Sequence, residues 1–155
     1  MSNGAIRLSA GLFAPALLAV AWATGASQTS DQVREAQSLK AVCARCHNLQ
    51  IVMDTPKSYD AWHDTVQKMV NLGAKGTDDQ YDDIMDYLHR TVTTIDVNSA
   101  DPDELEIVLN ASETTAQAIV ARRTTRKFTG LSDLKSIPGV DKSILNKKAR
   151  LIFFN

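Results

Sequence analysis

Cys43-Ala44-Arg45-Cys46-His47 is the stretch of this 155-residue chain that decides how its first half is interpreted. The spacing C-x-x-C-H is that of covalent haem attachment, in which two thiols take the porphyrin vinyl groups and the adjacent histidine binds the iron. Only two cysteines are present and both lie here, which argues against a structural disulfide or a four-cysteine zinc site. A redox-active dithiol is the alternative. The sequence therefore predicts one covalent haem c held by Cys43, Cys46 and His47.

An apolar segment near the N-terminus predicts export. Arg7 precedes an uncharged run over residues 8–22, and a small-residue cleavage site ends at Ala26, with cleavage after Ala23 as the alternative. The run is shorter than the roughly 20 residues of a spanning helix, which favours a cleaved signal peptide over residues 1–26 rather than an uncleaved membrane anchor. We therefore expect a periplasmic protein with no transmembrane segment in the mature chain.

Charge is distributed unevenly along the chain. The net charge of −1 combines +1 from Arg7, −4 over residues 27–96 (11 acidic and 7 basic) and +2 over residues 97–155 (7 acidic and 9 basic). Halves of different charge indicate different partners. A net charge of +2 is too small to predict strong binding to nucleic acid through counterion release.

Three helical patterns follow one another in the first half, and no strand pattern interrupts them. The first covers residues 30–42 and runs directly into the cysteine motif. The second covers residues 58–70, with Ser58 as its N-cap. The third begins at Thr77, which is spaced to form a capping box with Gln80. Three helices around a C-x-x-C-H motif are sufficient for a minimal haem domain.

The second half begins after a β-branched, polar stretch over residues 91–97, which predicts a linker or a short extended segment. We place a haem-binding domain at residues 27–92 and a second domain at residues 95–155, and expect an all-α fold. The second domain is predicted to contain four helices, over residues 101–109, 116–123, 131–136 and 142–153.

The second axial ligand of the haem is expected to be a methionine. Met53 follows His47 too closely for the chain to reach the opposite haem face, and Met85 lies on an apolar stripe, where methionine is more often core filler. Met69 stands 22 residues after His47 and just before a glycine-containing loop, a length that can cross the haem edge. The rival ligands are His63 and His89, both more typical of surface histidines.

Residues 39–90 resemble the short cytochrome c domains of quinohaemoprotein amine dehydrogenase subunits and related bacterial proteins. Those domains share the C-x-x-C-H motif, a W-x-x-x-V-x-x-M-V-x-x-G-A stretch and an acidic helix that ends in Tyr-Leu. The matching residues here are Trp62, Val66, Met69, Val70, Gly73, Ala74, Tyr87 and Leu88. The resemblance implies a class I cytochrome c domain with Met69 as the axial ligand.

Residues 95–154 resemble the ComEA-type helix-hairpin-helix module, and the resemblance implies a double helix-hairpin-helix fold. The matches, some with shifted spacing, are Val97, Asn98, Ala100, Glu104, Leu105, Arg122, Phe128, Leu131, Asp133, Leu134, Ile137, Pro138, Gly139 and Val140. Degenerate modules of this type also serve as protein-docking domains.

The hairpin turns bear on whether this module binds DNA. Helix-hairpin-helix units bind phosphate through a Gly-h-Gly turn, whose backbone N–H groups point at the ligand. The first turn here, at residues 110–112, lacks both glycines, and in the second turn the second glycine is replaced by Asp141, which would repel phosphate. We therefore favour protein docking over DNA binding. The candidate contact residues for either partner are Gly139, Lys142, Lys147 and Lys148.

These patterns together predict a periplasmic c-type cytochrome that transfers single electrons. His47 and Met69 would leave no open iron position for a substrate, so we expect an electron carrier rather than an enzyme. Its expected partner is a redox protein, for which a periplasmic dehydrogenase is one candidate. The alternatives are an envelope DNA-binding protein with a redox-active haem and a haem-based sensor in which a gas displaces Met69.

Overall fold

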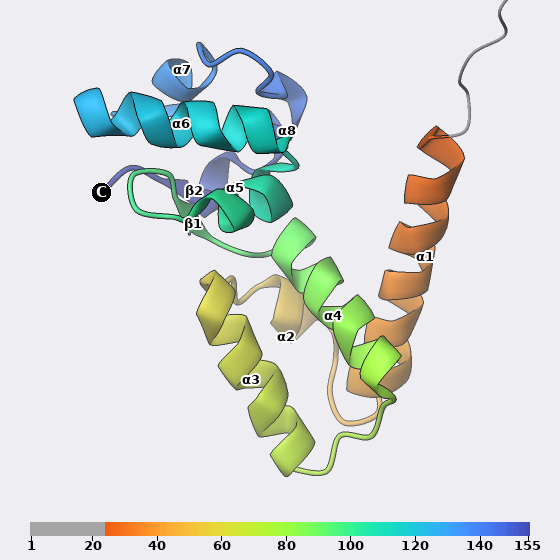
Figure 1. Ribbon diagram of the computed structural model, residues 1–155. Helices are drawn as coiled ribbons and strands as arrows, with labels where there is room; N and C mark the ends of the chain where they lie inside the picture. The colour runs from red at the N-terminus through yellow and green to blue at the C-terminus, as the bar shows by residue number, and fades with distance from the viewer. Residues whose placement is uncertain (1–23) are drawn as a thin grey trace, which may run out of the picture.

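The computed structural model describes the backbone of residues 24–155 and the side chains of residues 30–155, and it confirms an all-α fold (Figure 1). Most of the predicted signal peptide over residues 1–26 therefore lies outside the described residues. The helices are α1 (Thr24–Cys43), α2 (Gln50–Met53), α3 (Tyr59–Asn71), α4 (Asp78–Thr91), α5 (Pro102–Leu109), α6 (Glu113–Thr125), α7 (Leu131–Leu134), α8 (Lys142–Lys147) and the 3₁₀ turn η1 (Ala149–Leu151). No helix among these residues has both the length and the apolar character that crossing a bilayer requires.

Side-chain capping marks the starts of α4 and α5. Thr77 and Gln80 form the predicted capping box at the start of α4. Asp101 forms a second one with Glu104 at the start of α5, where Pro102 occupies the first helical position. Ser58 precedes α3 in an extended conformation, but its side chain makes no capping hydrogen bond.

Helix α1 packs along α4, and polar groups reinforce the apolar contact between them (Figure 1). Ser38 Oγ donates a hydrogen bond to Asp83 at 2.8 Å, and Arg34 Nε donates to the same carboxylate at 2.9 Å. These donors, Arg34 first, lower the pKa of Asp83 below its ordinary value. The buried Glu35 carboxylate pairs with Arg90 two turns further along α4. The orientation of α1 is therefore fixed by paired buried charges, which are costly to separate.

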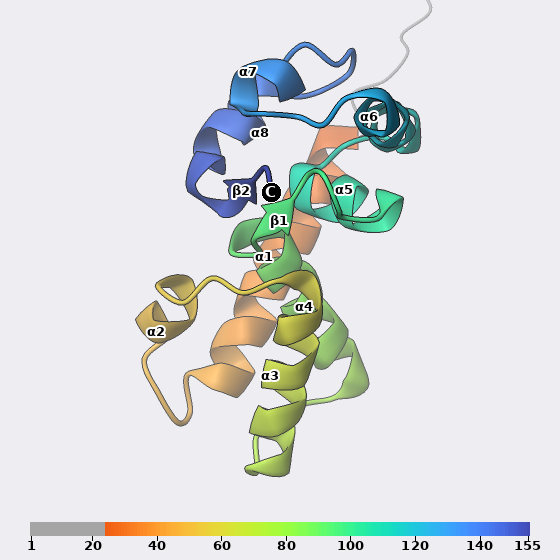
Figure 2. The ribbon, with the colours of Figure 1, turned by 90° about the vertical axis from the view of Figure 1, so that its left-hand side faces the viewer.

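Two hydrophobic cores divide the chain. The first gathers apolar side chains of α1, α3 and α4, namely Leu39, Val42, Trp62, Ile84, Leu88 and Val92. The second is built mainly from α5, α6 and the segments after them, with Leu105, Ala116, Ile119, Phe128, Leu134 and Leu145 among its buried members. Figure 2 shows α2, α3 and α4 on one side of β1, with α5 to α8 on the other side.

The stretch predicted as a linker or a short extended segment is found as the extended segment, and most of it after α4 is buried. Val92 belongs to the first core, whereas Ile95 and Val97 belong to the second. Thr93 between them is 1% exposed and donates its hydroxyl to the Leu88 carbonyl. β-branched residues favour this extended, packed conformation. The two cores are therefore joined by a short stretch of chain that both of them hold.

The prediction of one helix over residues 142–153 is wrong beyond Lys147. Helix α8 ends there, and after η1 the chain forms strand β2 (Ile152–Phe153), which pairs in parallel with β1 (Ile95–Asp96). Ile152 and Ile95 are opposite each other and both are buried in the second core. The short helix α2 was also not predicted, since a single turn leaves too little periodicity to detect.

Gly139 is required by packing as well as by backbone conformation. Its φ is +85°, and a Cβ at this position would lie 2.3 Å from Thr115 Oγ1 in the first turn of α6. Thr115 is buried and shares a hydrogen bond with Ser112, so it is not free to move away. We expect Gly139→Ala to lower the free energy of unfolding by about 2–4 kcal/mol in urea denaturation followed by circular dichroism.

Gly130→Ala is the matched control. Gly130 is extended (φ 170°) and no atom lies within 4 Å of a Cβ built there, so its free energy of unfolding should change by less than about 0.5 kcal/mol. Equal effects of the two substitutions would contradict the role given to the Gly139–Thr115 contact.

Candidate functional site

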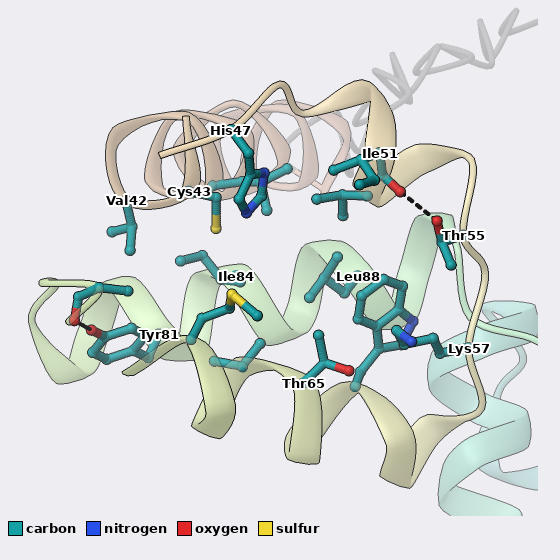
Figure 3. A pocket seen from close by; sticks show the side chains of 16 residues that line it. Val42, Cys43, His47, Ile51, Thr55, Lys57, Thr65, Tyr81, Ile84 and Leu88 are labelled. Carbon is teal, nitrogen blue, oxygen red and sulfur yellow. Dashed lines mark hydrogen bonds between the residues drawn. The ribbon is translucent and has the colours of Figure 1, made fainter. Parts of the chain in front are cut away.

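An apolar pocket of about 340 Å³ opens between α1, α3 and α4 (Figure 3). Leu39, Val42 and Cys43 contribute the α1 wall, and Ile84 and Leu88 contribute the α4 wall. The volume lies within the range of small-molecule and cofactor sites in proteins. Ile51 of α2 also lines the pocket and is 60% exposed, so this wall borders solvent.

The two cysteines differ in their relation to the pocket. Cys43 ends α1 and lines the pocket, whereas Cys46 is exposed and is not among the lining residues. The Cys46 N–H donates to the Cys43 carbonyl at 3.4 Å, which closes a turn after the helix. Both thiols are free, and burial, followed by the nearby Cys46, raises the pKa of Cys43. One thiol is therefore held in the pocket and the other in the adjoining turn.

His47 is half-buried and lines the same pocket. Its ring lies on the pocket side of the turn, near Cys43 (Figure 3). The Nδ1 atom lies 3.4 Å from the Asn48 carbonyl oxygen. When one ring nitrogen of a histidine faces a backbone carbonyl, the other is the one available to a metal. Nε2 of His47 is therefore the candidate ligand atom.

Met69 reaches the pocket from α3, on a different element from His47. The structure thus brings the two predicted axial residues to the lining of one cavity. Met53 and Met85 pack against the first core, but neither lines the pocket.

The rival histidines do not line the pocket either. His63 is exposed, as predicted, but His89 is only 3% exposed, so the prediction of a surface histidine is wrong for this residue. Its ring stacks on Tyr59 with centroids 3.8 Å apart. Tyr59 in turn packs against the second core, which places His89 where the two halves meet.

His47 and Met69 supply two ligands, which suits a metal whose remaining ligands belong to a cofactor. Among residues 30–155 no group of three or more His, Cys, Asp or Glu side chains is placed to hold a bare metal ion. One imidazole and one thioether are the axial pair of a haem iron, whose other four ligands come from the porphyrin. The Nε1 atom of Trp62, which lines the pocket, is buried without a hydrogen-bond partner. The pocket is apolar and the Trp62 N–H has no acceptor within the protein, so the site fits a cofactor that is mainly apolar and carries hydrogen-bond acceptors.

The hairpin turns of the second half satisfy their own backbone donors. Asn110 ends α5 in the left-handed conformation (φ 51°), and Ser112 then accepts a hydrogen bond from the Thr115 N–H. In the second turn the Asp141 carboxylate accepts from the Ser143 and Ile144 N–H groups at 2.7 and 3.2 Å. The N–H groups that a phosphate would use at this helix start are thus already bonded to a negatively charged side chain.

Several basic side chains of the second half are bonded within the domain. Arg123 donates to the carbonyls of Val97 and Ala100, and Arg126 pairs with Asp133. Lys148, a predicted contact residue, is half-buried and donates to the Val108 carbonyl. Burial lowers its pKa to about 8, with Arg90 adding to the effect. Within residues 30–155, the cations near α8 with no hydrogen bond or ion pair are Lys142, Lys147 and Arg150.

Comparison with known families identifies the second half. Residues 91–152 match the family model of the helix-hairpin-helix motif. This part of the chain is a helix-hairpin-helix domain. Searches of curated proteins and of solved structures found no match to the chain. The helix-hairpin-helix domain thus includes β1 and the α5–α8 region, together with the buried stretch that joins it to the first core.

Two features of the first half were missed from sequence. Lys57 lines the pocket although it lies in the loop before α3, and no motif marks it. The stacked pair of Tyr59 and His89 lies 30 residues apart in the chain and on different helices. The only available signal for Lys57 was Pro56 before it, which suggests a fixed turn but does not show which way the lysine points.

His89 makes the contact between the halves sensitive to acid. Burial lowers its pKa to about 4 from the ordinary 6.5, with His63 adding to the effect, so the folded protein keeps this ring neutral. The unfolded chain binds a proton below about pH 6.5 that the folded chain does not bind until about pH 4. We therefore expect the free energy of unfolding to fall by up to about 3 kcal/mol between pH 6.5 and 4.

Urea denaturation at stepwise pH tests this dependence. His89→Phe, which can still stack on Tyr59, should flatten the profile between pH 6.5 and 4.5, above the range in which most carboxylates titrate. His63→Phe removes only the smaller of the two causes, so it should reduce the slope by less than His89→Phe does. An unchanged slope in His89→Phe would exclude His89 as its cause.

Proposed function

We propose that this chain is a periplasmic electron carrier that holds one haem c covalently in the pocket of its first half. The single observation that carries the proposal is the placement of His47 and Met69 on one apolar pocket, with Cys43 beside them. The helix-hairpin-helix domain then serves to dock the carrier to a partner protein, for which a redox protein such as a periplasmic dehydrogenase is the expected class.

Each pocket residue has a defined part in this function. Cys43 and Cys46 would tether the cofactor through thioether bonds, while His47 Nε2 and the Met69 sulfur would hold its iron. The bound haem supplies an iron that changes by one electron between its ferric and ferrous forms. Met69 raises the reduction potential, because a thioether ligand favours the ferrous state. Because His47 and Met69 would together leave the iron no open position for a substrate, we expect a carrier rather than an enzyme.

The pocket walls contribute by excluding water. Leu39, Val42, Ile84 and Leu88 present only hydrocarbon to the cavity. A low-dielectric environment disfavours the more highly charged state of a redox centre, so these walls also favour the reduced form. The paired charges between α1 and α4 lie in the same half and keep these walls in register.

Docking to protein is supported by the way the second half uses its polar groups. Asp141 occupies the N–H groups at the start of α8, and Arg123 is committed to two carbonyls of its own domain. The remaining cations Lys142, Lys147 and Arg150 are few enough to suit an acidic protein surface better than a polyanion.

DNA binding is the second candidate function, because domains of the matched helix-hairpin-helix family commonly bind DNA. In such complexes backbone N–H groups at a helix start contact the phosphates. The family match favours this function, whereas the self-capped turns oppose it, and a binding measurement decides between them.

The ligand assignment predicts the spectrum of the oxidised holoprotein. The weak long-wavelength charge-transfer band that marks thioether ligation of ferric haem should be present in the unsubstituted protein and absent from Met69→Ala, because the sixth ligand is then lost. Met85→Ala is the matched control, since Met85 packs against the same core without lining the pocket. Survival of the band in Met69→Ala would remove Met69 as the ligand.

Retardation of duplex DNA tests the second candidate. We expect no retardation at about 0.15 M salt, since a net charge of +2 releases few counterions. Binding at that salt which is abolished by Lys142→Glu and retained by Lys68→Glu, on the exposed side of α3, would contradict protein docking as the sole role of this domain.

A further inference from the structure

Lys57 is the one lysine, arginine or carboxylate side chain among the described residues that line the pocket. It lies at the opposite end of the pocket from Val42 and Tyr81 (Figure 3). A cation beside an apolar cavity is costly unless a partner compensates it. No carboxylate among residues 30–155 pairs with it.

The backbone of Lys57 is held in place from outside the pocket. Its carbonyl accepts a hydrogen bond from the Thr94 N–H at 2.8 Å, and Lys57 forms an isolated parallel bridge with Thr93. Thr93 is 1% exposed and lies in the segment between the two cores. Pro56, immediately before Lys57, has a fixed φ and so restricts the backbone of the loop that carries Lys57. The position of Lys57 is therefore set by the buried connection to the second domain, not by the pocket.

A second hydrogen-bond donor, the indole N–H of Trp62, belongs to the ring beside the Lys57 side chain. The Lys57 Nζ lies 5.8 Å from the centroid of the Trp62 ring, a cation–π distance. The Trp62 Nε1 atom is buried and has no acceptor in the structure. Buried N–H groups are almost always bonded, so an acceptor here is expected from whatever fills the pocket. An ammonium and an indole N–H at one end of the pocket can both donate hydrogen bonds to a carboxylate, whose negative charge the ammonium compensates.

We propose that Lys57 binds a carboxylate of the cofactor and thereby orients it in the pocket. This inference rests on the proposed function, under which that carboxylate is a haem propionate. Lys57 is then a positioning residue, which fixes the polar edge of the cofactor while His47 and Met69 hold the metal. Its positive charge disfavours the more positive, oxidised state, so Lys57 also raises the reduction potential. Through Thr94, the same residue connects the cofactor to the helix-hairpin-helix domain.

Three variants of the holoprotein test this inference by redox titration. Lys57→Met keeps the length of the side chain without its charge, Lys57→Arg keeps the charge, and Lys68→Met removes an exposed charge from α3 outside the pocket. At the midpoint potential of the unsubstituted protein, we expect the ratio of reduced to oxidised protein to fall about tenfold in Lys57→Met. The ratio should stay within about twofold in the other two variants.

Resonance Raman spectra give an independent readout. The propionate-bending band should shift in Lys57→Met, because the hydrogen bond to the ammonium is lost, and it should keep its position in Lys68→Met. An unchanged ratio together with an unchanged band in Lys57→Met, with haem still attached, would overturn the role of Lys57 while the proposed function stands. An unsubstituted protein without covalent haem would instead overturn both.

Discussion

The packing of α1 against α4 is the contact on which the pocket depends. Leu39 and Val42 meet Ile84 and Leu88 across this contact, and the Glu35–Arg90 pair holds its other end. Because Cys43 is the last residue of α1, the same packing sets where the cysteine motif begins. Loss of Arg90 would leave the buried Glu35 carboxylate without a partner, which is among the more destabilising changes a protein can undergo.

A second constraint is the short buried connection between the two halves. Val92 belongs to the first core and Ile95 to the second, and the Thr94 N–H between them donates a hydrogen bond to the Lys57 carbonyl. Tyr59 reaches from α3 to the second core and stacks on His89. Besides this connection, the two halves therefore contact each other through the Thr94–Lys57 hydrogen bond, through Tyr59 and between α4 and α5.

The sequence predicted those features that depend on local chemistry. The capping box of Thr77 and Gln80, the approximate extents of α3 and α4 and the end of α1 follow from neighbouring residues, and the structure confirms them. The predicted start of the first helix at residue 30 is wrong, because α1 begins at Thr24. The pairing of β1 with β2 depends on residues more than fifty positions apart, and two-residue strands carry no readable alternation. The burial of His89 likewise depends on Tyr59, which α3 supplies from a distant position. At the pocket, the motif named the donor residues, but only the fold could show that Lys57 lies beside them.

The central claim is that a haem is bonded covalently to Cys43 and Cys46. The most direct measurement is the mass of the denatured protein from a host that matures c-type cytochromes, together with its pyridine haemochrome spectrum. The account predicts the added mass of one haem and a haemochrome typical of two thioether bonds, both lost when Cys43 and Cys46 are replaced by alanine. A denatured chain of unmodified mass with no haemochrome would contradict the account.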